Sequence, residues 1–169
     1  MTIRGKALKY GDGVNTDVII PSKYLIHTDK NELAKHAMAG IDIAFLQKVM
    51  EKRIIVAGKN FGCGSSREQA PIALKYAGVE CILAESFARI FFRNAINIGL
   101  PVLECEGISK TINEGDELYI DLKMGTIHDS TLGIELKARP LPDFLLEIIE
   151  KGLINYIRER RGERFTGSP

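Results

Sequence analysis

The chain has 169 residues, of which 45% are hydrophobic and 27% are charged, and its formal net charge at pH 7 is +1. This composition is typical of a globular protein, and the length suits one domain spanning residues 1–169. The near-neutral charge argues against nucleic acid as a partner. Neither an apolar run of ~20 residues nor a signal-peptide stretch is present, which argues against a membrane, so we expect a cytoplasmic protein.

The chain is predicted to begin with short elements. We expect a strand at residues 3–10 and a polar loop at residues 14–28. Two short helices are expected at residues 32–39 and 42–51. Pro21 lies within the loop. Asn31 is expected to cap the first helix, because its side chain accepts hydrogen bonds from unpaired backbone N–H groups.

The middle of the chain alternates apolar, β-branched runs with helical patterns. Three strands are expected at residues 53–58, 80–84 and 100–105, and two helices between them at residues 66–77 and 87–98. Gly78 and Gly99 end these helices, and Ser86 is expected to cap the second one. A series of this kind implies a parallel sheet with right-handed crossovers.

The pattern changes after the third of these strands. Residues 117–137 show short alternating strands joined by turns, which is typical of an antiparallel meander. Pro142 begins a final helical region, and residues 158–169 are expected to be a frayed tail. The predicted fold class is therefore α/β: a three-layer β/β/α domain with a parallel central sheet and a flanking antiparallel meander.

The cysteines and histidines give no sign of a metal site in this chain. Cys63, Cys81 and Cys105 are few and far apart, with no CxxC pair, and the three histidines lack zinc-ligand spacing. An iron–sulfur cluster normally takes several cysteine thiolates, so the sequence predicts no metal held by this chain alone. Cys63 is interpreted as a small packing residue rather than a nucleophile.

The glycine-rich segment Gly62–Glu68 is the best candidate for a ligand-binding loop. It lies between a predicted strand and a predicted helix, at the carboxyl end of the strand, where open α/β sheets bind their ligands. Gly62 and Gly64 allow a tight turn. Unpaired N–H groups at the start of the helix attract a phosphate or a carboxylate.

The polar residues of this loop have a structural and a functional interpretation. Ser65 with Glu68, and Ser66 with Gln69, both fit the capping box, which is a common structural signal. Arg67 favours function, because a cation is unfavourable in the first helical turn but can pair bidentately with a carboxylate. Nearby N–H groups and an arginine would also stabilise a serine alkoxide. Ser65 could then exchange a proton on a carbon next to a carboxylate, whereas the absence of a histidine from the loop argues against a Ser–His hydrolase.

Three blocks of sequence together resemble the swivelling domain of the aconitase superfamily. They are Asn15–Ile19, Asn60–Glu68 and Ala84–Ala95, in the order of the family, and the resemblance runs from about residue 3 to about residue 158. A free-standing chain of this size resembles the small subunit of a two-chain hydro-lyase. The resemblance implies no cofactor in this chain and a partner large subunit that carries a [4Fe-4S] cluster.

The resemblance also implies an activity and roles for the loop. The activity is the interconversion of 2-isopropylmalate and 3-isopropylmalate by dehydration and rehydration, in leucine biosynthesis, so the partners are a small hydroxy di- or tricarboxylic acid and the large subunit. Ser65 would be the catalytic base. Gly64, Ser66 and Arg67 would bind the substrate carboxylate, and Asp17 would support the site.

The loop after Pro21 is where the resemblance places substrate choice. Ile26 stands where homoaconitase-like relatives have an arginine, so it is expected to contact the substrate and to accept an isopropyl group. It would leave the extra carboxylate of homoaconitate unpaired, whereas apolar contact distinguishes substrates by only about 1–3 kcal/mol per methylene. Thr28 is assigned a supporting role, and the role of His27 stays open.

Two other functions remain open at this point. One is the small subunit of a homoaconitase, or of a hydratase for citraconate-type or methylmalate-type acids. The other is a non-catalytic module that binds small carboxylic acids with the same loop. Arg89 and Arg93, one helical turn apart, fit either a contact with a partner chain or a solvated helix face.

Overall fold

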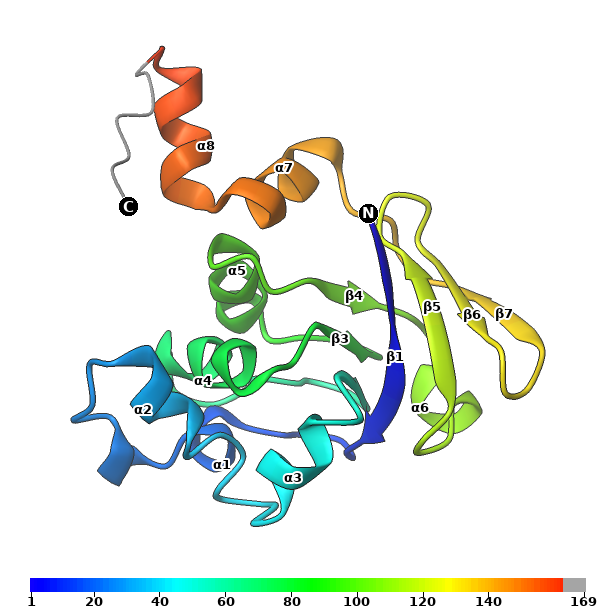
Figure 1. Ribbon diagram of the computed structural model, residues 1–169, viewed down its shortest axis with the longest axis horizontal. Helices are drawn as coiled ribbons and strands as arrows, with labels where there is room; N and C mark the ends of the chain where they lie inside the picture. The colour runs from blue at the N-terminus through cyan, green and yellow to red at the C-terminus, as the bar shows by residue number, and fades with distance from the viewer. Residues whose placement is uncertain (163–169) are drawn as a thin grey trace.

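The computed structural model of the chain describes residues 1–162, and Figure 1 shows their arrangement. The strands are β1 (Thr2–Lys9), β2 (Ile54–Ala57), β3 (Cys81–Ala84), β4 (Val102–Glu104), β5 (Glu117–Asp121), β6 (Thr126–Asp129) and β7 (Ile134–Lys137). The helices are α1 (Thr16–Ile19), α2 (Lys30–Ala34), α3 (Phe45–Val49), α4 (Gln69–Ala77), α5 (Arg89–Asn97), α6 (Ile108–Thr111), α7 (Asp143–Lys151) and α8 (Leu153–Arg160), with a 3-10 turn, η1, at Ser22–Tyr24.

The strands form a single mixed sheet in the order β4-β3-β2-β1-β5-β6-β7. β1 joins its two halves: Ala7–Lys9 pair in parallel with β2, and Thr2–Lys6 pair antiparallel with β5. Burial along β1 changes at the same point. Ala7 and Leu8 are both fully buried, as expected for a parallel strand covered on two faces, whereas the residues before them alternate.

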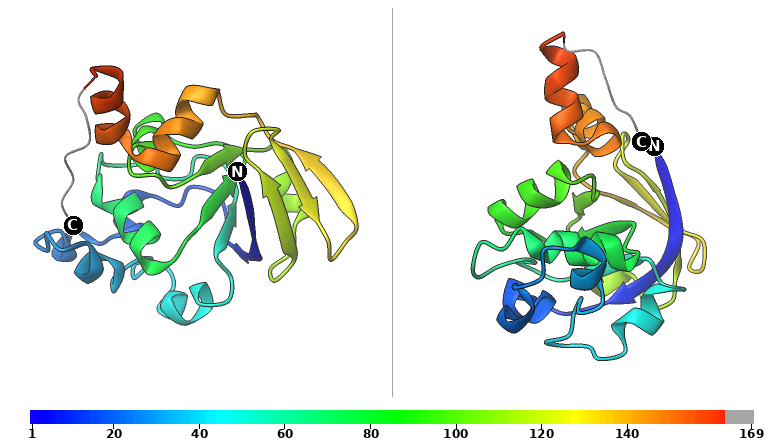
Figure 2. Two further views of the ribbon diagram at one scale, coloured as in Figure 1. Left: turned by 45° about the horizontal axis from the view of Figure 1, so that its top comes forward. Right: turned by 60° about the vertical axis from the view of Figure 1, so that its left-hand side comes forward.

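The order of the parallel strands explains the layers. β1 to β4 are neighbours in chain order, so right-handed crossovers place the connecting helices on one face of the sheet. On that face α4 packs against α5 and α2 packs against α4. On the other side α6 contacts β2 and β3, and the meander β5–β7 curves away from β1 (Figure 2). The predicted α/β class, with a parallel sheet and an antiparallel meander, is confirmed.

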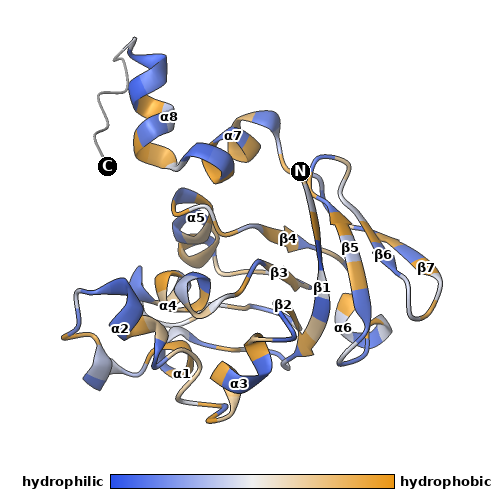
Figure 3. Ribbon diagram, in the orientation of Figure 1, coloured by the Kyte–Doolittle hydropathy of each residue, from blue (hydrophilic) through white to orange (hydrophobic). Residues whose placement is uncertain are grey.

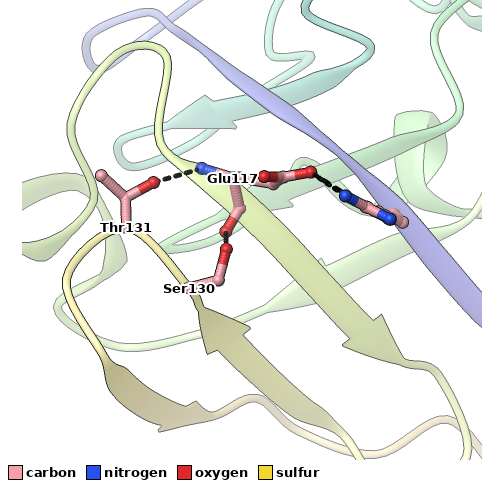
Figure 4. A network of polar contacts seen from close by, with 4 residues as sticks. Glu117, Ser130 and Thr131 are labelled. Carbon is pink, nitrogen blue, oxygen red and sulfur yellow. Dashed lines mark hydrogen bonds and ion pairs between the residues drawn. The ribbon is translucent and has the colours of Figure 1, made fainter.

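The meander is joined to the rest of the sheet by a common hydrophobic core and by polar contacts. Leu118, Ile120 and Ile127 are fully buried in the same hydrophobic cluster as the parallel strands. Glu117 adds polar contacts (Figure 4): its backbone N–H donates to Thr131 Oγ1 at 2.9 Å, and its carboxylate pairs with Arg4 of β1 at 2.6 Å. Ser130 Oγ donates to the Glu117 carbonyl at 3.1 Å.

The two C-terminal helices extend beyond the sheet. α7 packs on α5, and α8 projects further and contains no buried residue. Figure 3 shows that hydrophobic and hydrophilic residues alternate along α8. Residues 158–160 of the expected frayed tail are helical, and residues 163–169 lie outside the described part of the chain. No helix within residues 1–162 is long and apolar enough to cross a membrane.

Three local predictions in the first part of the chain were wrong. The loop expected at 14–28 contains α1 and η1. The helix expected at 32–39 ends at Ala34. Its cap is Asp29, not Asn31: Asp29 Oδ1 accepts from the backbone N–H groups of Asn31 and Glu32 at 2.9 and 3.0 Å. An ionised carboxylate at this place also interacts favourably with the helix dipole, which a neutral asparagine does not.

Ser86 does not cap α5, and α6 was not predicted. Ala88 occupies the cap position of α5, and no side chain caps it. Ser86 Oγ instead accepts the backbone N–H of Asn60 at 2.9 Å, because the loop after β3 runs beside the loop after β2. The serine therefore serves a contact between two loops, which local spacing could not indicate.

Candidate functional site

The three sequence blocks that carried the family resemblance meet at one place. The loop after β2 hydrogen-bonds to the loop after β3 through Phe61 N–Ser86 O and Ala88 N–Phe61 O, both 3.0 Å. On its other side it hydrogen-bonds to the segment before α1, through Gly62 N–Val14 O at 2.7 Å. The site therefore lies at the carboxyl ends of two parallel strands, as predicted.

Gly62 and Gly64 are required by the backbone, as predicted. Their φ angles are +79° and +89°, a region that side chains other than glycine rarely adopt. A Cβ atom on Gly62 would lie 2.2 Å from Cγ of Phe91. The rings of Phe61, Phe87 and Phe91 pack against one another there, with centroid distances of 5.3 to 6.3 Å. The loop thus rests directly on an aromatic cluster.

The loop and the start of α5 enclose a pocket of about 190 Å³. Its lining includes Gly64, Ser65, Ser66 and Arg67, so the structure brings these four predicted residues together. Ser65 and Ser66 are exposed, and neither hydroxyl has a hydrogen-bond partner within the described residues. Both hydroxyls are therefore free to meet a ligand.

Neither serine caps the following helix, so the capping-box interpretation was wrong. α4 begins at Gln69, and Glu68 occupies the cap position without a side-chain bond. Arg67 therefore precedes the helix rather than standing in its first turn, and the dipole argument does not apply to it directly. The two serines and the arginine belong to the loop, where their side chains are available for other contacts.

Arg67 is held in place by the segment that contains α1. Its Nη2 pairs with Asp17 Oδ1 at 2.6 Å, and its Nη1 donates to the carbonyl of Ile20 at 2.9 Å. The Arg67 side chain is only 15% exposed, whereas Asp17 is 60% exposed. The ion pair with Asp17 and the bond to Ile20 together fix the orientation of the Arg67 side chain. The remaining N–H groups of the guanidinium can still bind a carboxylate.

Two neighbours of Asp17 also support the loop. Asn15 Oδ1 accepts the backbone N–H of Val18 at 3.0 Å and so caps α1. Thr16 Oγ1 donates to the Ser65 carbonyl at 2.7 Å, and the Thr16 N–H donates to the Cys63 carbonyl at 2.8 Å. Thr16 was not predicted as a site residue. Its place between Asn15 and Asp17 in a family block was the only signal that could have found it.

Ile26 and Thr28 do not line the pocket around Ser65. Both are exposed on the loop between η1 and α2, and Ile26 is 80% exposed. In this chain, then, the position expected to choose the substrate lies apart from the position expected to move the proton.

Arg89 lies at the junction of two cavities. It lines the pocket around Ser65 and also a larger cavity of about 350 Å³. Arg93 and Arg139 line the larger cavity together with apolar residues, and Arg139 pairs with Glu104 at 3.5 Å. Both Arg89 and Arg93 are exposed. Contact with a partner chain and a solvated helix face remain the two explanations.

A carboxylate directly after β3 has a structural task. Glu85 follows β3 and accepts hydrogen bonds from Ser109 Oγ at 2.7 Å and from Gly107 N at 2.8 Å. Burial alone would raise the pKa of Glu85, but these bonds outweigh it and hold the pKa below its ordinary value. Glu85 therefore stays ionised and attaches α6 to the sheet.

Residues 1–162 contain no cluster of three or more histidine, cysteine, aspartate or glutamate side chains that could hold a metal. Burial raises the pKa of the Cys105 thiol to about 11 and raises that of Cys81 further. Neither is therefore a thiolate, the form that binds metals, at neutral pH. Cys63 is a partly buried free thiol in the loop.

The mixed sheet and this loop are those of the aconitase family, and residues 14–107 match the Aconitase C-terminal domain. The 3-isopropylmalate dehydratase small subunit of Clostridium beijerinckii is 55% identical over 161 residues, which cover 95% of this chain and 100% of the relative. The isopropylmalate/citramalate isomerase small subunit of Methanocaldococcus jannaschii is 53% identical over 162 residues, 95% of this chain and 96% of the relative.

Solved structures agree with these relatives. The crystal structure of a 3-isopropylmalate dehydratase from Methanocaldococcus jannaschii superimposes with a TM-score of 0.89 at 49% identity, covering 95% of this chain and 96% of that one. The chain belongs to the aconitase family, in the branch formed by the small subunits of 3-isopropylmalate dehydratase.

Proposed function

We propose that the chain is the small subunit of a hydro-lyase that interconverts 2-isopropylmalate and 3-isopropylmalate by dehydration and rehydration. The observation that carries this proposal is the loop Gly62–Glu68, whose free serine hydroxyls and oriented arginine lie in one pocket. The relatives that share almost the whole length of the chain carry the matching name. The implied pathway is leucine biosynthesis.

We infer that the chain forms one aconitase-like swivelling domain and works beside a large subunit. The names of its relatives imply such a partner. We propose that a [4Fe-4S] cluster is carried by the partner, because the described residues of this chain do not suit one: Cys81 and Cys105 are buried and far from the loop in sequence, and no ligand cluster is present among residues 1–162. The three free thiols suit a cytoplasmic, reducing location.

In this mechanism Ser65 handles the proton of the substrate carbon. Dehydration removes a proton from one carbon and hydroxide from its neighbour, and rehydration returns them with the two positions exchanged. The Ser65 alkoxide takes the proton as the double bond forms, and the hydroxyl returns it to the other carbon. Arg67 and the N–H groups of the loop stabilise the alkoxide, and Ser66, Arg67 and Gly64 bind the adjacent carboxylate.

Arg67 is better placed for this task than a free surface arginine would be. Its salt bridge to Asp17 and its bond to Ile20 fix the plane of the guanidinium before the substrate arrives. A carboxylate that then binds loses less side-chain freedom from the protein, which favours binding. The site is thus partly preorganised in the small subunit alone.

Substrate choice is assigned to Ile26, with Thr28 supporting its loop. An apolar, exposed isoleucine accepts an alkyl substituent and offers no partner to a further carboxylate, which disfavours homoaconitate. A second candidate is a citramalate-type acid with a smaller substituent, because one relative at 53% identity is named for both substrates. An apolar contact of this kind discriminates weakly between the two.

Reconstitution tests the proposal. The chain is mixed with a candidate large subunit whose cluster has been loaded, and turnover is measured on 2-isopropylmalate, citramalate and homoaconitate. We expect turnover of the first two, little of the third, and none with the chain alone. Turnover by the chain alone would contradict the need for a partner. Binding of these acids without turnover in every combination would identify a carboxylate-binding module instead.

A further inference from the structure

The rings of Tyr24, His36 and His27 form a stack, and Tyr24 and His27 precede and follow Ile26 in the sequence. The Tyr24 and His36 rings are nearly parallel, with centroids 3.8 Å apart and an interplanar angle of 4°. The His27 and His36 rings are 5.6 Å apart at 16°. Tyr24 and His27 belong to the loop that carries Ile26, whereas His36 lies in the turns after α2. One imidazole therefore contacts the residues on both sides of Leu25–Ile26.

The loop has no other polar attachment among the described residues. Its backbone hydrogen bonds are local: Tyr24 N–Pro21 O at 2.9 Å, Leu25 N–Ser22 O at 3.1 Å and His27 N–Tyr24 O at 3.2 Å. No side-chain hydrogen bond or ion pair within residues 1–162 involves residues 21–28. The position of the loop is thus set by packing, from Tyr24 and Leu25 against the core and from the ring stack.

His36 is itself attached to the part of the chain that holds Arg67. Two residues further on, Met38 N donates to the Ile19 carbonyl at 2.7 Å, and Gly40 N donates to the Val18 carbonyl at 3.0 Å. Ile19 and Val18 belong to α1, the helix of Asp17. The stack therefore connects the loop of Ile26 to the same helix that orients Arg67.

We propose that His36 is a positioning residue for substrate selectivity: by stacking on Tyr24 and His27 it fixes Ile26 relative to the carboxylate-binding loop. It does not contact the substrate. The inference rests on the proposed function, since it assumes that Ile26 meets the alkyl group of the substrate. It adds a residue outside the loop to those that decide which acid is accepted.

The test compares His36→Ala, which removes the ring, with His36→Phe, which keeps a flat ring that can stack. Both variants are reconstituted with the large subunit, and kcat and KM are measured for 2-isopropylmalate and for citramalate. We expect His36→Ala to raise the KM for 2-isopropylmalate about fivefold, the order of one lost aromatic pair, with kcat changed by less than about twofold. The KM for citramalate should rise less, and His36→Phe should restore the wild-type values.

Other outcomes overturn the inference. Equal changes in both KM values, a fall in kcat of the same size, or failure of phenylalanine to rescue would each show that His36 has a general structural role. A second readout uses the small subunit alone: hydrogen exchange of the Leu25 and His27 amides should quicken in His36→Ala and not in His36→Phe. Unchanged exchange would contradict the positioning role. Absence of turnover in the wild type as well would instead contradict the proposed function, and leave the exchange result to decide the role of His36.

Discussion

At the scale of single residues, three consecutive side chains hold the loop of the site, and each makes a different contact. Asn15 caps α1, Thr16 holds the carbonyl of Ser65, and Asp17 orients Arg67. Their common effect is to fix the loop against a helix of only four residues. The chemistry is assigned to Ser65 and Arg67, and the geometry depends on the residues that hold them.

Replacing Ser65 with alanine should stop proton transfer without disturbing the fold, because the hydroxyl makes no bond to the described part of the chain. In the reconstituted enzyme we expect kcat to fall by about 10²–10⁴-fold, the usual contribution of a general base, with KM changed little. Ser66→Ala is the matched comparison and should mainly raise KM. A Ser65→Ala enzyme with normal kcat would exclude Ser65 as the base.

Asp17→Asn should reduce kcat/KM about tenfold, because Arg67 loses its charged partner and its fixed orientation. Stability should change by less than about 1 kcal/mol, since Asp17 is largely exposed and such pairs contribute little. Steady-state kinetics and urea unfolding measure the two effects. Glu117→Gln is the control. It breaks the Arg4–Glu117 pair, also 2.6 Å, on the opposite side of β1 from β2, and should leave kcat/KM unchanged.

That four residues of the loop would lie together could be predicted from the sequence, but not the contacts that hold them. Gly64, Ser65, Ser66 and Arg67 are contiguous, and a glycine-rich turn between strand and helix is a local signal. The pairing of Asp17 with Arg67 could not be predicted, because the two residues are fifty positions apart along the chain and only the tertiary fold brings them together. The capping-box interpretation was wrong for a related reason. Contacts with the segment of α1 hold the residues around Ser65 in the loop, so α4 begins only at Gln69.

At the scale of elements, the buried parallel strands were the easiest to predict. β2 and β3 are continuous apolar runs with every residue buried, and the predicted bounds lie within about one residue of the observed ones. The short helices α1 and α6 and the early end of α2 could not be predicted. Segments of four or five residues are too short for helical periodicity, and their conformation depends on contacts with other segments.

Gly62→Ala should lower the free energy of unfolding more than an alanine at the other glycine of the loop, Gly64. The φ angle of +79° strains an alanine, and its Cβ would overlap Phe91. We expect the free energy of unfolding to fall by about 3 kcal/mol, from overpacking together with the left-handed backbone. Urea unfolding measures the change. Gly11→Ala is the control, since its added Cβ has no neighbour within 4 Å; equal stability of the two variants would contradict the prediction.

The end of β6 contains a buried carboxyl that should make stability depend on pH. Asp129 is fully buried; its Oδ1 accepts from Thr131 N and Leu132 N, whereas Oδ2 has no partner among the described residues. Burial, and the nearby Asp116 carboxyl, raise the pKa of Asp129. A raised pKa means that folding favours the protonated form. This contribution is complete below about pH 4, the ordinary value, and is lost as pH rises through the folded pKa.

Asp129→Asn should therefore stabilise the chain at pH 7 by about 1 kcal/mol, since its amide can donate to Asp116 and needs no ionisation. The gain should shrink toward pH 4. Urea unfolding at several pH values measures the stability of the variant and of the wild type, and the difference between them is compared. The lowered pKa values of Asp42 and Glu85 make stability rise with pH in both proteins, so their effect cancels in this difference. A variant that is less stable than wild type at pH 7 would contradict this assignment.

At the scale of the whole molecule, β1 joins the parallel and the antiparallel halves of one sheet. Its second half continues the parallel strands that carry the site, and its first half begins the meander. The sequence indicated both patterns, but not that a single strand serves both, because pairing partners far apart in the chain leave no local mark. The meander β5–β7 therefore extends the sheet on the side of β1 that is away from the site.

An exposed apolar surface lies beside α1 and should contact the large subunit. It consists of Ile41 and Ile43 before α3, Leu46 on it and Met50 directly after it, and Ile43 is 99% exposed. The bond from Gly40 N to the Val18 carbonyl attaches this segment to α1, so the surface borders the residues that orient Arg67. Exposed apolar side chains that lie close together along the chain are typical of contacts with another protein, so we expect the partner to bind here.

Ile43→Asp should weaken the complex without changing the small subunit itself, because a side chain so exposed contributes little to folding. A charge buried in an apolar interface without a partner costs several kcal/mol, so we expect the dissociation constant to rise at least about 30-fold. Titration of the large subunit, followed by activity and by calorimetry, measures the change. Met124→Asp is the control, because Met124 is also exposed but lies between β5 and β6; an equal effect of both substitutions, or none from Ile43→Asp, would move the interface elsewhere.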